Sequence, residues 1–290
     1  MKRFLTAAVA LLCLAACAPK NEAPKVMARL VPERADDFAW ENDYVAYRAY
    51  GEALETLPGG ALTSPGFDVW VKNVTDLVMD KRYKDDIENG ISYHKDHGQG
   101  KDCYKVGVTL GGGASVPVVD GNLSFPATNF RSSEVLEQTP DKVVFVLRYP
   151  QWEAGGYKIA LDKKITVEAG SHFCKAEDVY TFEGPSDQLC IAAGVVRHDV
   201  VAQSILWDRF AIWEKASDTG AEPEESCIGL AVIMPGAETC GQEFDLQHTL
   251  CSKTVRSGET LTYWFGSCWE KADIPTAEDW FGLVGDFKAE

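Results

Sequence analysis

The sequence predicts an all-β protein, a large antiparallel β-sandwich with few short helices. Segments rich in β-branched and aromatic residues recur from about residue 36 to the C-terminal part of the chain. Turn-forming pairs such as Ala169-Gly170, Gly184-Pro185 and Pro235-Gly236 separate many of these segments. Helical periodicity is scarce, so the sheets have to supply most of the core.

The expected strands lie at 143–149, 157–161, 165–168, 173–182, 189–196, 206–213, 227–234 and 260–265. The segment 157–167 alternates, which places Ile159 and Leu161 on one face and Lys158 and Asp162 off it. The apolar run 228–234 is unbroken, which predicts a central strand buried on both faces.

Two short helices are expected. One lies near 83–88, where Asp80 could act as the cap. The other covers 276–284, with Thr276 as its cap and Asp279 at the acid position of a capping box.

The N-terminus has the pattern of a bacterial lipoprotein export signal. Lys2 and Arg3 precede an apolar stretch from 4 to 16 that ends in Leu14-Ala15-Ala16-Cys17. The stretch is shorter than the roughly 20 residues that span a bilayer. We therefore expect residues 1–16 to be a signal peptide, lipidation at Cys17, a lipidated N-terminus and tether over 17–30, and a single β-sandwich domain over 31–290.

The alternative is an ordinary secretory signal that contains Cys17 by chance. Either signal places the folded part outside the cytoplasm, and the lipoprotein signal places it at the bacterial cell envelope, on the periplasmic or the cell-surface side. The anchor would be its only contact with the membrane.

The charge of the chain limits its partners. The sequence has 28 basic and 44 acidic residues, and removal of Lys2 and Arg3 takes the formal charge from −16 to −18. Nucleic acid is therefore excluded as a partner. A neutral ligand fits this charge, and an anionic ligand requires a local cluster of cations.

Seven cysteines remain beyond Cys13 and Cys17, so at least one is unpaired. They lie at 103, 174, 190, 227, 240, 251 and 268. The last four could form one or two disulfides in an exported protein, and buried free thiols on strands fit equally well.

The first segment with candidate functional residues is 34–50. A strand that presents Trp40 and Asn42 on one side, while Val45 and Tyr47 pack inward, would suit a sugar, because sugars offer C–H faces and paired hydroxyls. The alternative is an edge strand with solvated acids and a tryptophan in the core.

The second segment is 93–105, where Gly98 and Gly100 favour a loop that presents polar groups. His94 and His97 are candidates for acid–base chemistry or substrate binding. A divalent metal held by both histidines with Asp96 or Asp102 is a second interpretation, and a solvated loop is a third. No cofactor is predicted.

Two other features bear on this loop. Gly111-Gly112-Gly113 is not followed by the Lys and Ser/Thr of a phosphate-binding loop, so it predicts a bulge or a tight turn. Arg197 and His198 end an apolar strand, where side chains reach the rim of a sandwich, and they are the expected distant partners of the loop.

The run Ala-Asp-Asp-Phe-Ala-Trp-Glu-Asn-Asp within 34–50, and the run from His97 to Gly107, resemble a Bacteroidota lipoprotein family known as domain of unknown function 4861. The resemblance covers nearly all of the mature chain. It implies a fold similar to the galactose-mutarotase-like supersandwich. It also implies a place in polysaccharide-degradation systems, often beside unsaturated-uronide hydrolases.

Supersandwich enzymes include sugar epimerases and polysaccharide lyases, which need a base, an acid and, for uronides, a cation beside the carboxylate. The expected function is therefore lyase, hydrolase or epimerase chemistry on uronate-containing oligosaccharides. The alternative is a non-catalytic glycan-binding lipoprotein of a polysaccharide-utilisation system. The candidate catalytic residues are His94, His97, Tyr104 and His198, and the candidate substrate-binding residues are Trp40, Asn42, Arg48, Lys101, Lys105 and Arg197.

The anchor can be tested directly. Cys17→Ala should abolish lipid labelling and release the chain from membranes, because the thiol that carries the lipid is removed. Metabolic labelling with a fatty acid and membrane fractionation measure both effects. Unchanged labelling and fractionation would contradict the lipoprotein interpretation.

Overall fold

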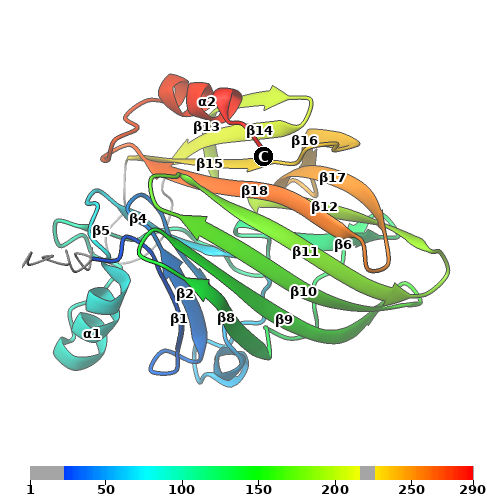
Figure 1. The fold of residues 1–290 in the computed structure, drawn as a ribbon, viewed down its shortest axis with the longest axis horizontal. Helices are drawn as coiled ribbons and strands as arrows, with labels where there is room; N and C mark the ends of the chain where they lie inside the picture. The colour runs from blue at the N-terminus through cyan, green and yellow to red at the C-terminus, as the bar shows by residue number, and fades with distance from the viewer. Residues whose placement is uncertain (1–22, 216–225, 290) are drawn as a thin grey trace, which may run out of the picture.

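A computed structural model of the chain describes residues 23–215 and 226–289, so the predicted signal peptide and Cys17 lie outside the described residues. Three antiparallel sheets form a large β-sandwich, as the sequence predicts (Figure 1). The figure shows α2 lying on one face of the largest sheet and α1 beside the N-terminal strands.

The first sheet, here called the N-terminal sheet, has the order β1-β2-β3-β4-β5. Its strands are β1 (Met27–Val31), β2 (Asp37–Glu41), β3 (Ala46–Ala49), β4 (Asp68–Lys72) and β5 (Gly100–Asp102). Since β1 begins at Met27, the expected tether over 17–30 is too long by four residues, which pair with β2 instead.

The eight-stranded sheet has the order β13-β14-β15-β18-β11-β10-β9-β8. Its strands are β8 (Ser132–Gln138), β9 (Lys142–Ala154), β10 (Tyr157–Glu168), β11 (Phe173–Glu183), β13 (Asp199–Leu206), β14 (Arg209–Lys215), β15 (Cys227–Ile233) and β18 (Thr260–Trp269). Two expected strands, 157–161 and 165–168, form the single strand β10. The expected strand 206–213 is wrong at its start, because a turn at Trp207 and Asp208 joins β13 to β14.

The third sheet has the order β16-β17-β12-β6-β7. Its strands are β6 (Gly112–Val119), β7 (Asn122–Leu123), β12 (Gln188–Val196), β16 (Thr239–Phe244) and β17 (His248–Arg256). Cys240 and Cys251 lie opposite each other on β16 and β17 and form a disulfide, one of the pairs that the sequence allows. Gly111 and Gly113 have φ values of 54° and 137°, so the glycine run makes the expected tight turn where β6 begins.

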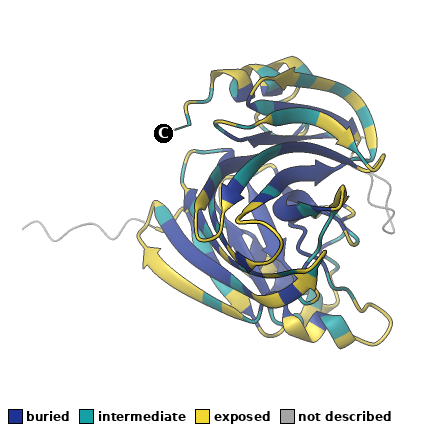
Figure 2. Ribbon diagram, turned by 90° about the vertical axis from the view of Figure 1, so that its right-hand side faces the viewer, coloured by how far each residue is buried: buried dark blue, intermediate teal, exposed yellow. Residues whose placement is uncertain are grey.

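One hydrophobic core contains side chains from all three sheets, and Figure 2 shows the buried residues gathered between them. β15 is buried on both faces, as its apolar run predicts. Leu230 and Val232 face this core, whereas Ala231 and Ile233 pack with Trp280 of α2 on the opposite face.

Both α-helices begin at polar groups that satisfy their first backbone N–H groups. α2 (Ala277–Asp286) is capped by Thr276, whose Oγ1 accepts from the N–H of Asp279 at 3.2 Å, as the sequence predicts. α1 (Met79–Asn89) starts earlier than expected, and Asp80 is not its cap. The carboxylate of Glu41 on β2 accepts from the N–H groups of Val78 and Met79 instead. A short 3₁₀ helix, η1 (Glu52–Thr56), follows β3.

The sandwich core also encloses an ion pair. Lys163 of β10 and Asp178 of β11 are direct cross-strand partners, and both side chains are fully buried. Lys163 Nζ donates to Asp178 Oδ2, to Ser115 Oγ at 3.2 Å and to Tyr263 OH at 3.2 Å. Burial lowers the pKa of Lys163, while the charge of Asp178 opposes that change.

Removing one member of this pair should destabilise the fold strongly. Lys163→Met leaves the Asp178 carboxylate buried without its cation, which should cost about 3–5 kcal/mol. The double variant Lys163→Met, Asp178→Leu removes both charges and should recover most of that loss. Urea unfolding of the two variants measures the difference, and a single variant within about 1 kcal/mol of the wild type would contradict it.

Candidate functional site

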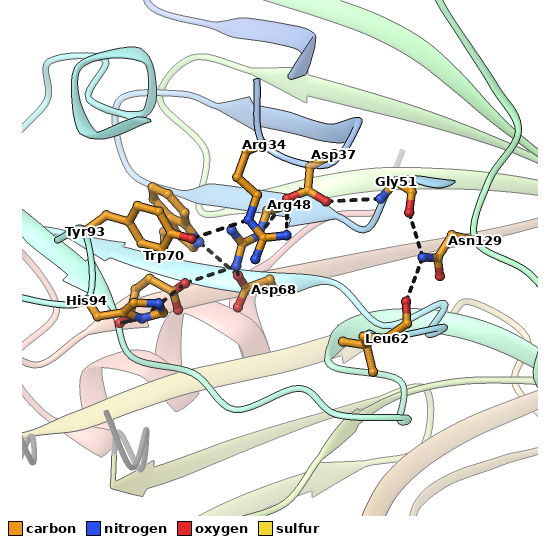
Figure 3. A network of polar contacts seen from close by, with 11 residues as sticks. Arg34, Asp37, Arg48, Gly51, Leu62, Asp68, Trp70, Tyr93, His94 and Asn129 are labelled. Atoms are coloured by element: carbon orange, nitrogen blue, oxygen red, sulfur yellow. Dashed lines mark hydrogen bonds and ion pairs between the residues drawn. The ribbon is translucent and has the colours of Figure 1, made fainter. Parts of the chain in front are cut away.

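A row of charged side chains crosses the outer face of the N-terminal sheet (Figure 3). It takes Asp37 from β2, Arg48 from β3, Asp68 from β4 and Asp102 from β5. Arg48 lies directly opposite Asp68, and its Nη2 donates to Asp68 Oδ2 and, at 3.1 Å, to Asp102 Oδ2. Its Nε lies 3.7 Å from Asp37 Oδ2. One guanidinium therefore connects four strands.

Aromatic rings enclose this guanidinium. Its central carbon lies 5.1 Å from the ring centroid of Trp70 and 5.6 Å from those of Tyr50 and Tyr93. Burial opposes the charged form, but the three carboxylates outweigh it and raise the pKa of Arg48 well above its ordinary value. Arg48 is thus a permanent buried cation.

Asp37 differs from the other carboxyl groups of the row. Burial raises its pKa to about 6, although Arg48 and Arg34 act in the opposite direction. Its Oδ1 accepts from the N–H of Gly51 at 3.1 Å. Asn129 continues the network in Figure 3 by donating to the carbonyl of Gly51.

His94 lies at the end of the row. Its Nδ1 is 3.3 Å from the carbonyl oxygen of Asp102 and 3.6 Å from Asp102 Oδ2, and its ring lies 4.6 Å from that of Tyr93. The side chain is 42% exposed. The backbone carbonyl of Asp102 therefore orients an imidazole that solvent can reach, and the carboxylate that Arg48 holds lies beside the ring. This arrangement is suited to proton transfer.

A second histidine and carboxylate contact the far end of the same segment. His198 Nδ1 lies 2.8 Å from Glu214 Oε1, and its Nε2 lies 2.8 Å from the carbonyl oxygen of Lys105. Its ring meets that of Tyr104 edge to face at 5.0 Å. The structure thus brings His198 against the loop at 93–105, the position expected for a distant partner.

The hydroxyl of Tyr104 is hydrogen-bonded to the backbone. It donates to the carbonyl of Val196 at 2.9 Å and lies 3.2 Å from that of Gly111, and burial raises its pKa well above the ordinary value. Tyr104 therefore positions the loop against β12 and is not suited to donate a proton to substrate.

Three residues that the sequence placed on a sugar-binding surface are buried instead. Trp40 is fully buried, with its ring 5.1 Å from Phe67 and 5.3 Å from Phe145, so it has no face for a sugar. Asn42 is also enclosed, and it donates to the carbonyls at 168 and 171. Arg48 is paired with Asp68 in the buried row, so it does not bind a uronate carboxylate at the surface.

Four candidate residues remain, and they differ in exposure and in their contacts. Lys101 is buried, whereas Lys105 is exposed. Arg197 is bound to Glu243 Oε1 at 2.8 Å and to Thr249 Oγ1 at 2.8 Å. His97 is exposed, and its Nε2 lies 3.2 Å from the carbonyl of Ser92 beside a cavity of only about 20 Å³.

A larger cavity, which the sequence did not reveal, lies on the outer face of the eight-stranded sheet. Its volume is about 530 Å³, and we call it the outer groove. It is lined by Lys142, Lys164, Lys175, Lys288, Glu137, Glu168, Glu177, Val144, Thr166, Ser171, Phe173, Trp264 and Phe287. Residues that face outward on β9, β10 and β11 alternate with core residues. This alternation is the sequence pattern that could have indicated the face on which the groove lies.

Within 23–215 and 226–289, no group of three or more His, Cys, Asp or Glu side chains is placed to hold a metal ion. Neither α1 nor α2 is long and apolar enough to cross a membrane.

A family model named domain of unknown function (DUF4861) matches residues 14–290. The chain belongs to this family. A relative described as uncharacterized protein P7 of Formosa agariphila is 31% identical over 274 residues. That alignment covers 89% of this chain and 66% of the relative, so the relative is the longer protein.

Two solved structures are similar at a much lower level. The GH36 α-galactosidase AgaB of Geobacillus stearothermophilus is 8% identical with a TM-score of 0.35, and the match covers 85% of this chain and 41% of that one. A variant of the GH36 α-galactosidase AgaA from the same organism, in complex with raffinose, is 7% identical with a TM-score of 0.31, covering 80% and 40%. Both scores lie below 0.5, and neither likeness says what this chain acts on.

The contact between His198 and Glu214 should make stability depend on pH. Burial lowers the pKa of His198, but the hydrogen bond and charge of Glu214 outweigh it and raise the pKa. The resulting stabilisation is present below the unfolded pKa of about 6.5 and is lost as pH rises through the higher folded value. Urea unfolding across this range should show the loss in the wild type and a flatter profile in Glu214→Gln.

Glu243→Gln is the matched control, because Glu243 pairs with the neighbouring Arg197 at the surface and does not touch His198. Its profile should follow that of the wild type. Equal pH profiles for the wild type and Glu214→Gln would contradict the assignment.

Proposed function

We propose that this protein acts on acidic carbohydrates at the bacterial cell envelope, through acid–base chemistry at His94. The observation that carries the proposal is the series His94, Asp102 and Arg48. A solvent-accessible imidazole contacts the backbone carbonyl of Asp102 and lies beside its carboxylate, which a buried cation holds in place. A base that is oriented in this way can abstract a proton from a sugar carbon or hydroxyl.

His94 is better placed for this chemistry than His97. The Nδ1 of His94 lies 3.3 Å from the backbone carbonyl of Asp102 and 3.6 Å from its Oδ2, whereas the Nε2 of His97 lies 3.2 Å from the carbonyl of Ser92. His94 therefore lies beside a carboxylate that Arg48 holds in place. We therefore assign the base to His94.

Substrate charge follows from the surroundings of the loop. The chain carries a formal charge of −16, so an anionic oligosaccharide needs cations along its binding surface. Lys105 is exposed at the far end of the 93–105 segment from His94, where His198 contacts its backbone, and we assign it to a uronate carboxylate of the bound oligosaccharide. Lyase, hydrolase and epimerase chemistry all remain compatible with one base and one cation here.

The second candidate function is non-catalytic binding of a glycan. The outer groove favours it, because this cavity of about 530 Å³ joins aromatic and charged side chains on a rigid sheet. Under either function we also propose that Cys17 anchors the chain to the membrane.

Substitution of His94 separates the two functions. His94→Gln should lower turnover of a uronate-containing oligosaccharide about a hundredfold or more, because the acid–base group is lost. Asp102→Asn should lower kcat with little change in KM and should shift the pH profile, since it acts through His94. Chromatography of reaction products from a panel of such oligosaccharides measures turnover.

His97→Gln is the matched control, and it should retain turnover within a few-fold of the wild type. Full turnover in His94→Gln would contradict the assignment of the base. Binding of these oligosaccharides without any turnover by the wild type would favour the non-catalytic function instead.

A further inference from the structure

We propose that the outer groove is a binding site for an anionic carbohydrate chain, separate from the site at His94. The proposal rests on the proposed function for the class of ligand. It does not rest on catalysis. The groove shares no lining residue with the 93–105 loop, and it lies on the eight-stranded sheet, whereas the loop borders the N-terminal sheet.

The groove occupies the part of the sheet that α2 leaves uncovered. α2 packs against β13, β14 and β15, and the groove follows on β8 to β11 and β18. Phe287, just beyond α2, closes one side, with its ring 4.4 Å from Phe173 and 6.0 Å from Trp264. Figure 1 shows the C-terminus lying in front of this sheet. A volume of about 530 Å³ is within the usual range of ligand sites, roughly 300–1,000 Å³.

The balance of charge in the groove is opposite to that of the chain. Four lysines and three glutamates line it, in a chain that has 28 basic and 44 acidic residues. Two lysines are paired with glutamates inside the groove, where Lys164 lies 2.8 Å from Glu177 and Lys142 lies 3.2 Å from Glu137. The described lining has one more lysine than glutamate, so its charge is opposite in sign to that of the whole chain.

The arrangement also suits a sugar in particular. Phe287 is half-buried beside the lysines of the groove, whereas Phe173 and Trp264 are buried, and Lys175 Nζ lies over the Trp264 ring at 5.1 Å from its centroid. Sugar C–H groups pack on aromatic surface, hydroxyls bind to ammonium and carboxylate groups, and uronate carboxylates pair with lysine. A small inorganic anion would use only the lysines and would leave the aromatic side unoccupied.

Asn42 gives the groove a fixed wall. Its Nδ2 donates to the carbonyls of Glu168 at 2.6 Å and Ser171 at 2.8 Å, and both of these residues line the groove. Asn42 is therefore a positioning residue for the turn between β10 and β11. The neighbouring Asp43 Oδ1 accepts from the N–H of Gly170 at 2.7 Å, which adds a second contact to the same turn.

The test is protection of lysines from acetylation. The full chain is treated with a low concentration of an acetylating reagent, with and without a purified oligogalacturonate of about six sugars, and each lysine is followed by peptide mass spectrometry. Lys142, Lys164, Lys175 and Lys288 should be protected by about threefold or more. Lys84 of α1 and Lys158, both exposed and outside the groove, are internal controls. A neutral maltohexaose should protect none of them.

Variants confirm the location by a second measurement. Lys164→Gln with Lys175→Gln should weaken oligogalacturonate binding at least tenfold in calorimetry, because two cations of the groove are lost. Lys158→Gln, on the same strand β10, should leave affinity unchanged. Phe287→Leu should weaken binding further, because it removes the half-buried aromatic side chain of the groove. Both lysine substitutions are at partly exposed positions, so the fold is retained.

Each outcome decides the proposal. Groove protection that is specific to oligogalacturonate, with loss of affinity in the double variant, supports it. Protection of Lys95 and Lys105 alone would overturn the groove and leave the proposed function intact. Equal protection by maltohexaose would overturn the anionic class of ligand. Absence of any binding by the wild type to uronate oligosaccharides would overturn both this inference and the proposed function.

Discussion

The contact of Arg48 with three carboxyl groups is the constraint on which the candidate catalytic end of the molecule depends. Four neighbouring strands each supply one member of the row, so their register has to bring Asp37, Asp68 and Asp102 to a single guanidinium. Burying these charges is costly, and the attraction between the guanidinium and the carboxylates offsets that cost only when they lie close together. The same row fixes Asp102, and Asp102 orients His94.

A second contact on this face shows how local and long-range structure depend on each other. Glu41 of β2 binds Lys72 of β4 at 3.1 Å and also accepts from the first backbone N–H groups of α1. The sheet therefore sets where α1 begins. α1 in turn packs Tyr83 against Trp70, with ring centroids 5.1 Å apart, and so covers the side of the charged row.

These contacts explain which parts of the fold the sequence could predict. β10 alternates regularly, β15 is uniformly apolar and α2 carries its own cap at Thr276, so local patterns were sufficient for them. The N-terminal sheet is buried on both faces, and alternation cannot separate the core face from a face covered by a helix. The sequence therefore left Trp40 between a sugar-binding surface and the core, and the structure places it in the core.

The cap of α1 was missed for a related reason. Glu41 is 38 residues from Met79 along the chain, and no local pattern links them. Lys163 gives no local sign either, because a lysine in an alternating strand indicates an exposed face unless its partner is known. That partner, Asp178, lies on the next strand. Strand register determines which buried charges pair with each other, and the register is known only from the three-dimensional structure.

The two candidate sites differ in how far the sequence could locate them. The loop at 93–105 is a contiguous run of histidines, lysines and acids, so composition alone marked it, although only the structure distinguishes His94 from His97. The outer groove takes its lysines from three strands and the C-terminal segment, and no run of sequence contains more than a few of its residues. The groove residues lie at outward positions of the sheet, and every half-exposed strand alternates between outward and buried residues. Alternation alone therefore does not reveal a ligand site. What distinguishes this one is that four lysines from separate parts of the chain gather beside three glutamates, a property of cross-strand geometry that gives the groove a charge opposite in sign to that of the chain.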